Sequence, residues 1–222
     1  MSVEPQSRAQ RKLIAAARLS AAHLPPALPP AWFVTDPART PDPAAIASGL
    51  PAGFGVIYRH FGAADRERVA RTLAGICARR GLAFLVAADP GLAAKVGADG
   101  VHWPSRLRHA ARRWQTRFAV QTVSAHSARE LRVAARLPVD AVLLSTVFAS
   151  RSASAGTAMG ALRFRQLVRD AGLTVYALGG VAPENAGGIS KVAGFAAVDG
   201  MCAFTAGPRR ESGHSQSPQR SS

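Results

Sequence analysis

Short apolar or β-branched runs alternate with segments of helical spacing from Trp32 onward. The helical spacing is clearest at 64–80, 127–136 and 162–171, and Gly81 and Gly172 follow two of these segments as expected C-terminal stops. Such alternation is typical of repeated βα units, so the sequence predicts a single (β/α)8 TIM barrel with a parallel sheet. Its eight expected strands are 31–35, 55–58, 83–87, 100–103, 118–123, 141–145, 174–178 and 195–198.

The two ends of the chain do not follow this repeat. Residues before Pro25 have the pattern of one amphipathic helix, and the run LPPALPP predicts a stiff linker. Beyond Phe204 there is almost no apolar content, which predicts disorder. We therefore expect an N-terminal helix and Pro-rich linker at 1–30, the barrel at 31–204 and a disordered basic tail at 205–222. No eighth helix is obvious, and either the N-terminal helix or a partner subunit could cover that gap.

Composition narrows the class of partner and compartment. The net charge is +15 and comes almost wholly from arginines spread over the predicted helices, which favours a solvated surface over a nucleic-acid interface. Cys77 and Cys202 are far apart in apolar contexts, as in a reduced cytoplasmic protein. No run approaches the roughly 18 apolar residues of a membrane span, and no signal-peptide core is present, so no membrane partner is expected.

Several motifs fall at predicted strand ends. They are VGADGVHWP at 96–104, TVSAHSARE at 122–130, STVFASRS at 145–152 and VYALGGV at 175–181, with WFVTD at 32–36 and GFAAVDGMCAF ending at Phe204. Their order and spacing resemble the thiamin phosphate synthase/TenI family from about Trp32 to Phe204. This resemblance implies a small phosphorylated thiazole-type ligand bound at the carboxyl ends of the strands.

The pair Gly179-Gly180 ends the seventh predicted strand and would leave backbone amides open to a phosphate. The alternative is that the two glycines only form a tight turn. The resemblance implies the phosphate role and completes it with the turn at Met201, Cys202 and Ala203. In the long loop after the sixth strand, Ser150 and Ser152 occupy the family's hydroxyl positions.

His126 lies just after the fifth strand, and an imidazole can both give and take a proton near neutral pH. The resemblance implies this catalytic role in a thiazole tautomerase, with Ser124 as the expected hydrogen-bonding partner; capping of the next helix is the alternative. Arg59 falls at the arginine of the family's VQLRxK strand end and is a candidate for binding the substrate's anionic group, with an ion pair as the alternative. His102 is expected to be a core residue.

The sequence departs from the family's synthases at the positions that hold a divalent cation and pyrophosphate. Ungapped alignment places Ala87 and Ala88 where an Asn and an Asp are expected, with Asp89 displaced by one position, and HWPSRLRH offers no carboxylate. Two lysines and a glutamine are also replaced, by Phe61, Ala153 and Ile57. These losses remove most of what stabilises a pyrophosphate leaving group, so we expect no tight metal site and no cofactor.

Three hypotheses follow. The first is a protein of thiamin metabolism that binds a thiazole phosphate and tautomerises it without metal. The second is a thiamin phosphate synthase with a rearranged magnesium site that uses Asp89 and Asp199. The third is a non-catalytic sensor or interaction protein with a phosphate pocket. The substrate, the role of the basic tail and the assembly state, including a homo-oligomer, stay open.

Overall fold

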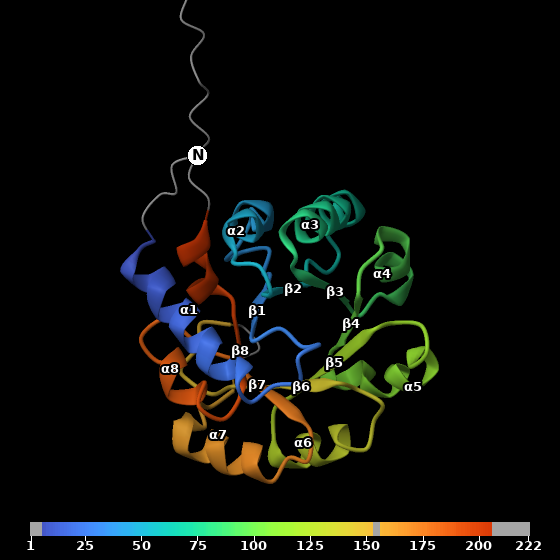
Figure 1. The fold of residues 1–222 in the computed structure, drawn as a ribbon. Helices are drawn as coiled ribbons and strands as arrows, with labels where there is room; N and C mark the ends of the chain where they lie inside the picture. Colours follow the sequence, from blue (N-terminus) through green and yellow to red (C-terminus); the bar gives the residue numbers. More distant parts are fainter. Residues whose placement is uncertain (1–5, 153–155, 206–222) are drawn as a thin grey trace, which may run out of the picture.

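The computed structural model describes residues 6–152 and 156–205, and its centre is a closed barrel of eight parallel strands (Figure 1). The strands pair in chain order, and β8 closes on β1 with Trp32 beside Ala196. This confirms the predicted (β/α)8 architecture. The strands are β1 (Ala31–Val34), β2 (Gly55–Tyr58), β3 (Ala83–Ala87), β4 (Gly100–Trp103), β5 (Val120–Ala125), β6 (Ala141–Leu144), β7 (Thr174–Ala177) and β8 (Gly194–Ala197).

Helices surround the barrel and connect successive strands (Figure 1). Several are a single turn or two, too short to show helical spacing in the sequence, and these were not predicted. The strand boundaries differ from the predicted ones by up to two residues, as at β5. The helices are α1 (Arg8–Ala21), α2 (Pro43–Gly49), α3 (Arg66–Arg80), α4 (Pro90–Val96), η1 (Ser105–Ala110), α5 (Ala111–Trp114), α6 (Ala128–Ala134), α7 (Gly160–Arg169), α8 (Ala186–Ile189) and η2 (Asp199–Phe204).

Large aromatic side chains fill the barrel interior towards its N-terminal end. The rings of Trp32 and Tyr176 meet edge to face with centroids 6.2 Å apart, and both residues are fully buried. Glycines make room for them: a Cβ on Gly55 would lie 2.2 Å from the Trp32 ring, and one on Gly194 would lie 2.3 Å from the Tyr176 ring. The interior is therefore a packed core, and a ligand can enter only at an end of the barrel.

Helix α1 covers the place where an eighth helix would follow β8. It packs against β8, α8 and η2 (Figure 1). Its buried residues are Leu13, Ala16, Ala17 and Ser20. The hydroxyl of Ser20 donates to the carbonyl oxygen of Ala193 at 2.8 Å. Of the two ways left open for covering the gap, the chain's own N-terminal helix is therefore the one observed.

The linker after α1 closes the N-terminal end of the barrel. Leu24 and Leu28 pack against the apolar interior, and the Tyr176 hydroxyl donates to the Pro29 carbonyl at 2.7 Å. With this end blocked, the carboxyl ends of the strands are the open end. The predicted disorder at 205–222 concerns residues that, apart from Thr205, lie outside the described part of the chain.

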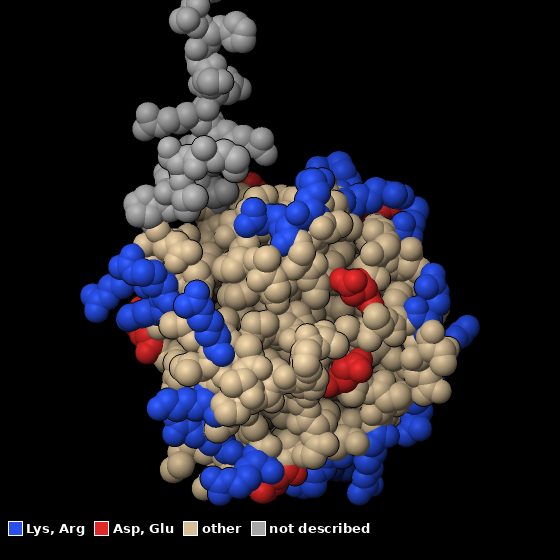
Figure 2. Space-filling view, viewed as in Figure 1, with Lys and Arg blue, Asp and Glu red and all other residues tan. Residues whose placement is uncertain are grey.

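The face in Figure 2 carries lysines and arginines around its edge and mostly uncharged residues over its middle. On this face the charge is scattered, as expected for a solvated surface. In the described residues, no helix is long and apolar enough to cross a membrane.

Candidate functional site

A pocket of about 260 Å³ opens at the carboxyl ends of the strands. It is lined from the segments that follow β1, β2, β5, β6, β7 and β8, which is the location of active sites in TIM barrels. The structure brings most of the predicted site residues together here: Arg59, Ser124, His126, Ser150, Ser152, Gly179 and Gly180.

Consecutive backbone N–H groups after β7 are available to a ligand. Gly179, Gly180 and Val181 line the pocket, and none of their backbone N–H groups donates to an acceptor within residues 6–152 and 156–205. Free amides in a row at a turn are a common anion-binding arrangement. The turn itself is held by Asn185, whose side chain donates to the Gly180 carbonyl and accepts from the Ala182 N–H, both at 2.9 Å.

The two glycines are also required by the fold. Their φ angles are +88° and +63°, and a Cβ on Gly180 would lie 2.2 Å from the carbonyl oxygen of Ala149. The β6–α7 loop therefore occupies the space where a side chain at position 180 would lie. This loop is held against the turn by the Phe148 N–H, which donates to the Gly179 carbonyl at 3.0 Å. The tight-turn alternative therefore accounts for both glycines, and only the free amides speak for a ligand.

The turn predicted at Met201, Cys202 and Ala203 does not line the pocket. The 3-10 helix η2 begins at Asp199, and the pocket lining in this part of the chain is Ala197 at the end of β8 and residues 198–200 after it. Met201 is fully buried in the core. The sequence prediction placed this turn too late because a six-residue helix at the strand end has no signal in the pattern.

The hydrogen-bonding partner of His126 is Ser145, at 2.9 Å between Nδ1 and Oγ, and not the predicted Ser124. Ser124 lies on the inner face of β5, where its hydroxyl meets Nε2 of His102 at 2.9 Å. His126 does not cap the next helix, since that role belongs to Ser127, whose Oγ accepts from the Glu130 N–H. The His126 imidazole is solvent-exposed at the pocket and fixed through one nitrogen.

His102 is a core residue, as predicted. Its second ring nitrogen, Nδ1, meets the hydroxyl of Thr122 at 2.8 Å, so both ring nitrogens have partners. Burial, together with the charge of Arg59 and the neighbouring His126, lowers the pKa of His102 to about 3. The ring is therefore neutral at ordinary pH, and its Nε2 contacts the hydroxyl of Ser124, a residue that lines the pocket.

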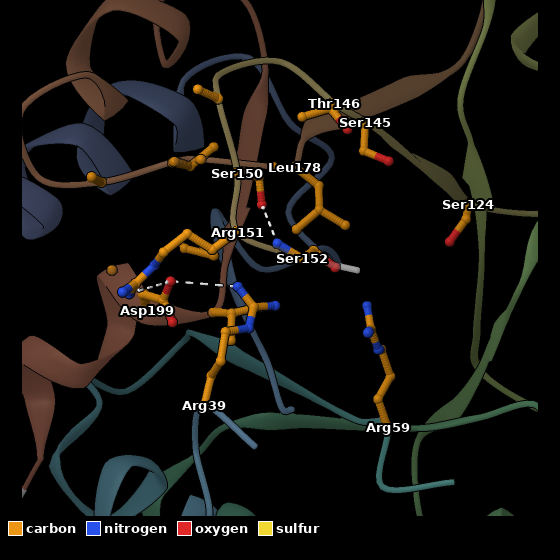
Figure 3. Close-up of a pocket in the computed structure, with 18 of the residues that line it drawn as sticks. Arg39, Arg59, Ser124, Ser145, Thr146, Ser150, Arg151, Ser152, Leu178 and Asp199 are labelled. Carbon is orange, nitrogen blue, oxygen red and sulfur yellow. Dashed lines mark hydrogen bonds and ion pairs between the residues drawn. The ribbon is translucent and has the colours of Figure 1, made fainter. Parts of the chain in front are cut away.

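Three arginines line the pocket: Arg39 after β1, Arg59 after β2 and Arg151 after β6. Arg59 makes the ion pair that was its alternative role, at 3.9 Å from Asp36, yet its Nε has no partner in the described part of the chain. In Figure 3, Arg39 and Arg59 project into the pocket from one side, with Ser145, Thr146 and Leu178 across from them. Arg39, Arg151 and Ser145 were not predicted: Arg39 lies outside the quoted motifs, and within STVFASRS only Ser150 and Ser152 were singled out.

The carboxylates considered for magnesium do not form a suitable set. Asp89 caps α4 by accepting from the Leu92 N–H at 2.9 Å, and its other oxygen lies 3.9 Å from Nε of Arg66. One oxygen of Asp199 lies 3.4 Å from Arg39 and 3.2 Å from Arg151. Within the described residues, no three His, Cys, Asp or Glu side chains are grouped so as to hold a metal ion. The residues present therefore do not fit the cation of the synthase reaction.

These features define the class of protein: a parallel TIM barrel with a polar pocket at the carboxyl ends of its strands. Residues 31–202 match the TMP-TENI family, described as thiamine monophosphate synthase. The chain belongs to this family, which confirms the resemblance seen in the sequence.

Named relatives agree with this assignment. Thiamine-phosphate synthases of Geobacillus thermodenitrificans and Geobacillus kaustophilus are 31% identical over 146 residues and 33% identical over 147 residues. Each match covers 64% of this chain and 64% of the relative, so the chain spans less than two thirds of these relatives' length.

Solved structures show the same fold. Thiamine phosphate pyrophosphorylase from Pyrococcus furiosus superposes with a TM-score of 0.68 at 21% identity, covering 81% of this chain and 93% of that one. FabK from Thermotoga maritima has a TM-score of 0.61 at 14% identity, covering 78% of this chain and 58% of that one. At these identities the likeness concerns the fold alone.

Proposed function

We propose that this member of the family binds a thiazole phosphate at its open mouth and moves a proton on the thiazole with His126. The observation that carries the proposal is the row of free N–H groups at Gly179, Gly180 and Val181, in the same pocket as His126. Backbone amides bind the phosphate, and the arginine side chains add positive charge.

Tautomerisation needs no redox partner and no leaving group, because a proton leaves one ligand atom and a proton is added at another. One imidazole can do both. Ser145 holds Nδ1 of His126 at 2.9 Å, which leaves Nε2 for the ligand. In this proposal His126 is the catalytic residue and Ser145 is a positioning residue.

The second candidate is the synthase reaction, which the names of the Geobacillus relatives favour. Departure of pyrophosphate requires several positive charges on the leaving group. The engagement of Asp89 as a helix cap and of Asp199 with two arginines counts against a magnesium-bound leaving group here.

Proton NMR of thiazole phosphate in D2O tests the proposal, because the protein should speed exchange of a carbon-bound ligand proton. We expect His126→Asn to abolish the exchange and Ser145→Ala to slow it roughly tenfold and to shift its pH profile, with thiazole phosphate affinity kept. Ser124→Ala is the matched control. It removes a partner of His102 rather than of His126, so its pH profile should stay that of the parent.

Other outcomes of these experiments would support one of the other two hypotheses or contradict the phosphate site. Binding that survives in His126→Asn, with no exchange in the parent, supports the non-catalytic sensor. Coupling of an aminomethyl-pyrimidine pyrophosphate to the thiazole phosphate that requires magnesium supports the synthase. Failure to bind thiazole phosphate more tightly than its dephosphorylated form contradicts the phosphate site common to all three hypotheses.

A further inference from the structure

Two arginines from different loops contact one carboxylate in the pocket that Gly179, Gly180 and Val181 also line. Arg39 Nη1 and Arg151 Nη2 both contact Oδ2 of Asp199 (Figure 3). Asp199 immediately precedes Gly200, which lines the pocket together with Gly180. Asp199 itself lines this pocket, as do Gly179, Gly180 and Val181, whose amides are the proposed phosphate site.

Arg39 is anchored independently of Asp199. Its Nη2 lies 3.2 Å from Oδ2 of Asp36, and the other oxygen of Asp36 accepts from the N–H groups of Ala38 and Arg39, each at 3.1 Å. Burial alone would raise the pKa of Asp36, but these hydrogen bonds and the guanidinium charge outweigh it and lower the pKa. Arg39 thus has an anchor at Asp36 that does not depend on the contact between its Nη1 and Asp199.

Arg151 is held differently. Its side chain is 82% exposed, and its guanidinium group contacts Asp199 at 3.2 Å. An exposed ion pair of this kind contributes at most about 1 kcal/mol, so an incoming anion can replace the carboxylate at little cost. A phosphate oxygen accepts from two guanidinium groups at least as well as a carboxylate oxygen does.

Charge supports the exchange of one anion for another. The three pocket arginines face the two carboxylates Asp36 and Asp199, which leaves an excess of a single positive charge. A phosphate monoester carries close to two negative charges near neutral pH. It is better compensated when Arg39 and Arg151 turn from Asp199 to the phosphate.

We propose that Arg39 and Arg151 form a guanidinium clamp for the ligand's phosphate, and that Asp199 occupies the clamp until the phosphate displaces it. The ligand class is a phosphate monoester bound as the dianion. This inference rests on the proposed phosphate site and adds two side chains that bind the ligand and one that competes with it.

Calorimetric titration with thiazole phosphate at several salt concentrations tests the clamp. We expect Arg39→Met and Arg151→Met each to weaken binding roughly tenfold and to reduce its salt dependence. Asp199→Asn should bind at least as tightly as the parent, because the competing carboxylate is gone. Arg163→Met is the matched control: this exposed arginine of α7 is not among the pocket residues, and its loss should change affinity less than twofold.

The outcomes separate the clamp from the proposed function. If the parent prefers the phosphorylated over the dephosphorylated thiazole but both arginine variants bind like the parent, the clamp is wrong and the amide site stands. If Asp199→Asn weakens binding as much as the arginine variants do, displacement of Asp199 is wrong. If the parent shows no such preference, both proposals fail. Arg151→Met alters only an exposed side chain, so it gives a result even if Arg39→Met folds poorly.

Discussion

Two histidines near the same pocket have different environments. His102 is enclosed, with both nitrogens held by hydroxyls of β5, whereas His126 is exposed and held through Nδ1 alone. The same side chain is thus a neutral core group in one place and, in our proposal, the acid or base in the other. Only the second environment suits proton transfer.

The buried histidine makes stability depend on pH. The pKa of His102 is about 3 in the folded protein and 6.5 ordinarily, so between these values the unfolded chain binds one more proton than the folded one. Stability therefore falls as pH drops below about 6.5, by up to about 1.4 kcal/mol per pH unit. Urea denaturation at pH 7, 6 and 5 should show this fall, and His102→Asn should flatten it.

His109→Asn is the control for this measurement, because His109 is exposed on η1. It should keep the slope of the parent. A parent whose stability is the same at pH 7 and pH 5 would contradict the neutral, buried state of His102.

At the scale of elements, the mouth depends on loops that brace one another. The turn after β7 supports the β6–α7 loop through close backbone contact at Gly180, and Asp199 joins that loop to the one after β1. A substitution in one of these three loops should therefore alter the conformation of the other two.

Gly180→Ala should cost more stability than Gly172→Ala. Both glycines have φ near +65°, at +63° and +66°, but an added Cβ meets Ala149 at 2.2 Å in the first case and nothing within 4 Å in the second. We expect about 1 kcal/mol for Gly172→Ala from backbone strain alone. Gly180→Ala should cost about 2–4 kcal/mol and also weaken thiazole phosphate binding. Equal losses of stability in denaturant titrations would mean that the β6–α7 loop moves to accommodate the added methyl group without cost.

Helix α1 should behave as an integral helix of the barrel layer. Leu13 of this helix is fully buried in the core, whereas Leu19 of the same helix is 45% exposed. We expect Leu13→Ala to lower the free energy of unfolding by about 2–5 kcal/mol and Leu19→Ala by less than about 0.5 kcal/mol. Equilibrium unfolding in urea measures both. A small loss for Leu13→Ala would indicate that the barrel is stable without α1.

For the whole molecule, the response of the melting temperature to ligands distinguishes the candidate functions. We expect magnesium alone to leave the melting temperature unchanged and thiazole phosphate to raise it. At a ligand concentration one hundred times Kd the stabilisation is about 2.7 kcal/mol, or roughly 5–10 °C for a domain of this size.

A magnesium-dependent rise that disappears in Asp89→Ala would contradict this and favour the synthase. The Asp89→Ala variant also loses a helix cap, so Asp42→Ala is the matched control. Asp42 caps α2 in the same way, with a proline at the next position. Both variants should lose about 1 kcal/mol of stability. Only a difference between them in the presence of magnesium would indicate a metal.

The barrel could be predicted from the sequence because short apolar runs such as WFV at 32–34 and AVLL at 141–144 are typical of buried strands, and eight of them recur with helices between. His126, Arg59 and Gly179 could be placed because each lies within two residues of a strand end. Arg39 and Arg151 could not, since their shared partner, Asp199, lies far from both in the chain. The Ser145 partner of His126 was missed because strand order alone does not say which hydroxyl a ring will meet.

The packing of α1 on β8 has a consequence for the order of folding. The contact between Ser20 and Ala193 joins residues 173 positions apart, so helix α1 is synthesised well before strand β8, which covers part of its apolar face. Contacts of such long sequence separation form late and slow the overall rate. A ribosome-bound chain that lacks β8 would expose Leu13 and the open seam between β1 and β7, and a chaperone would have its best opportunity at that stage.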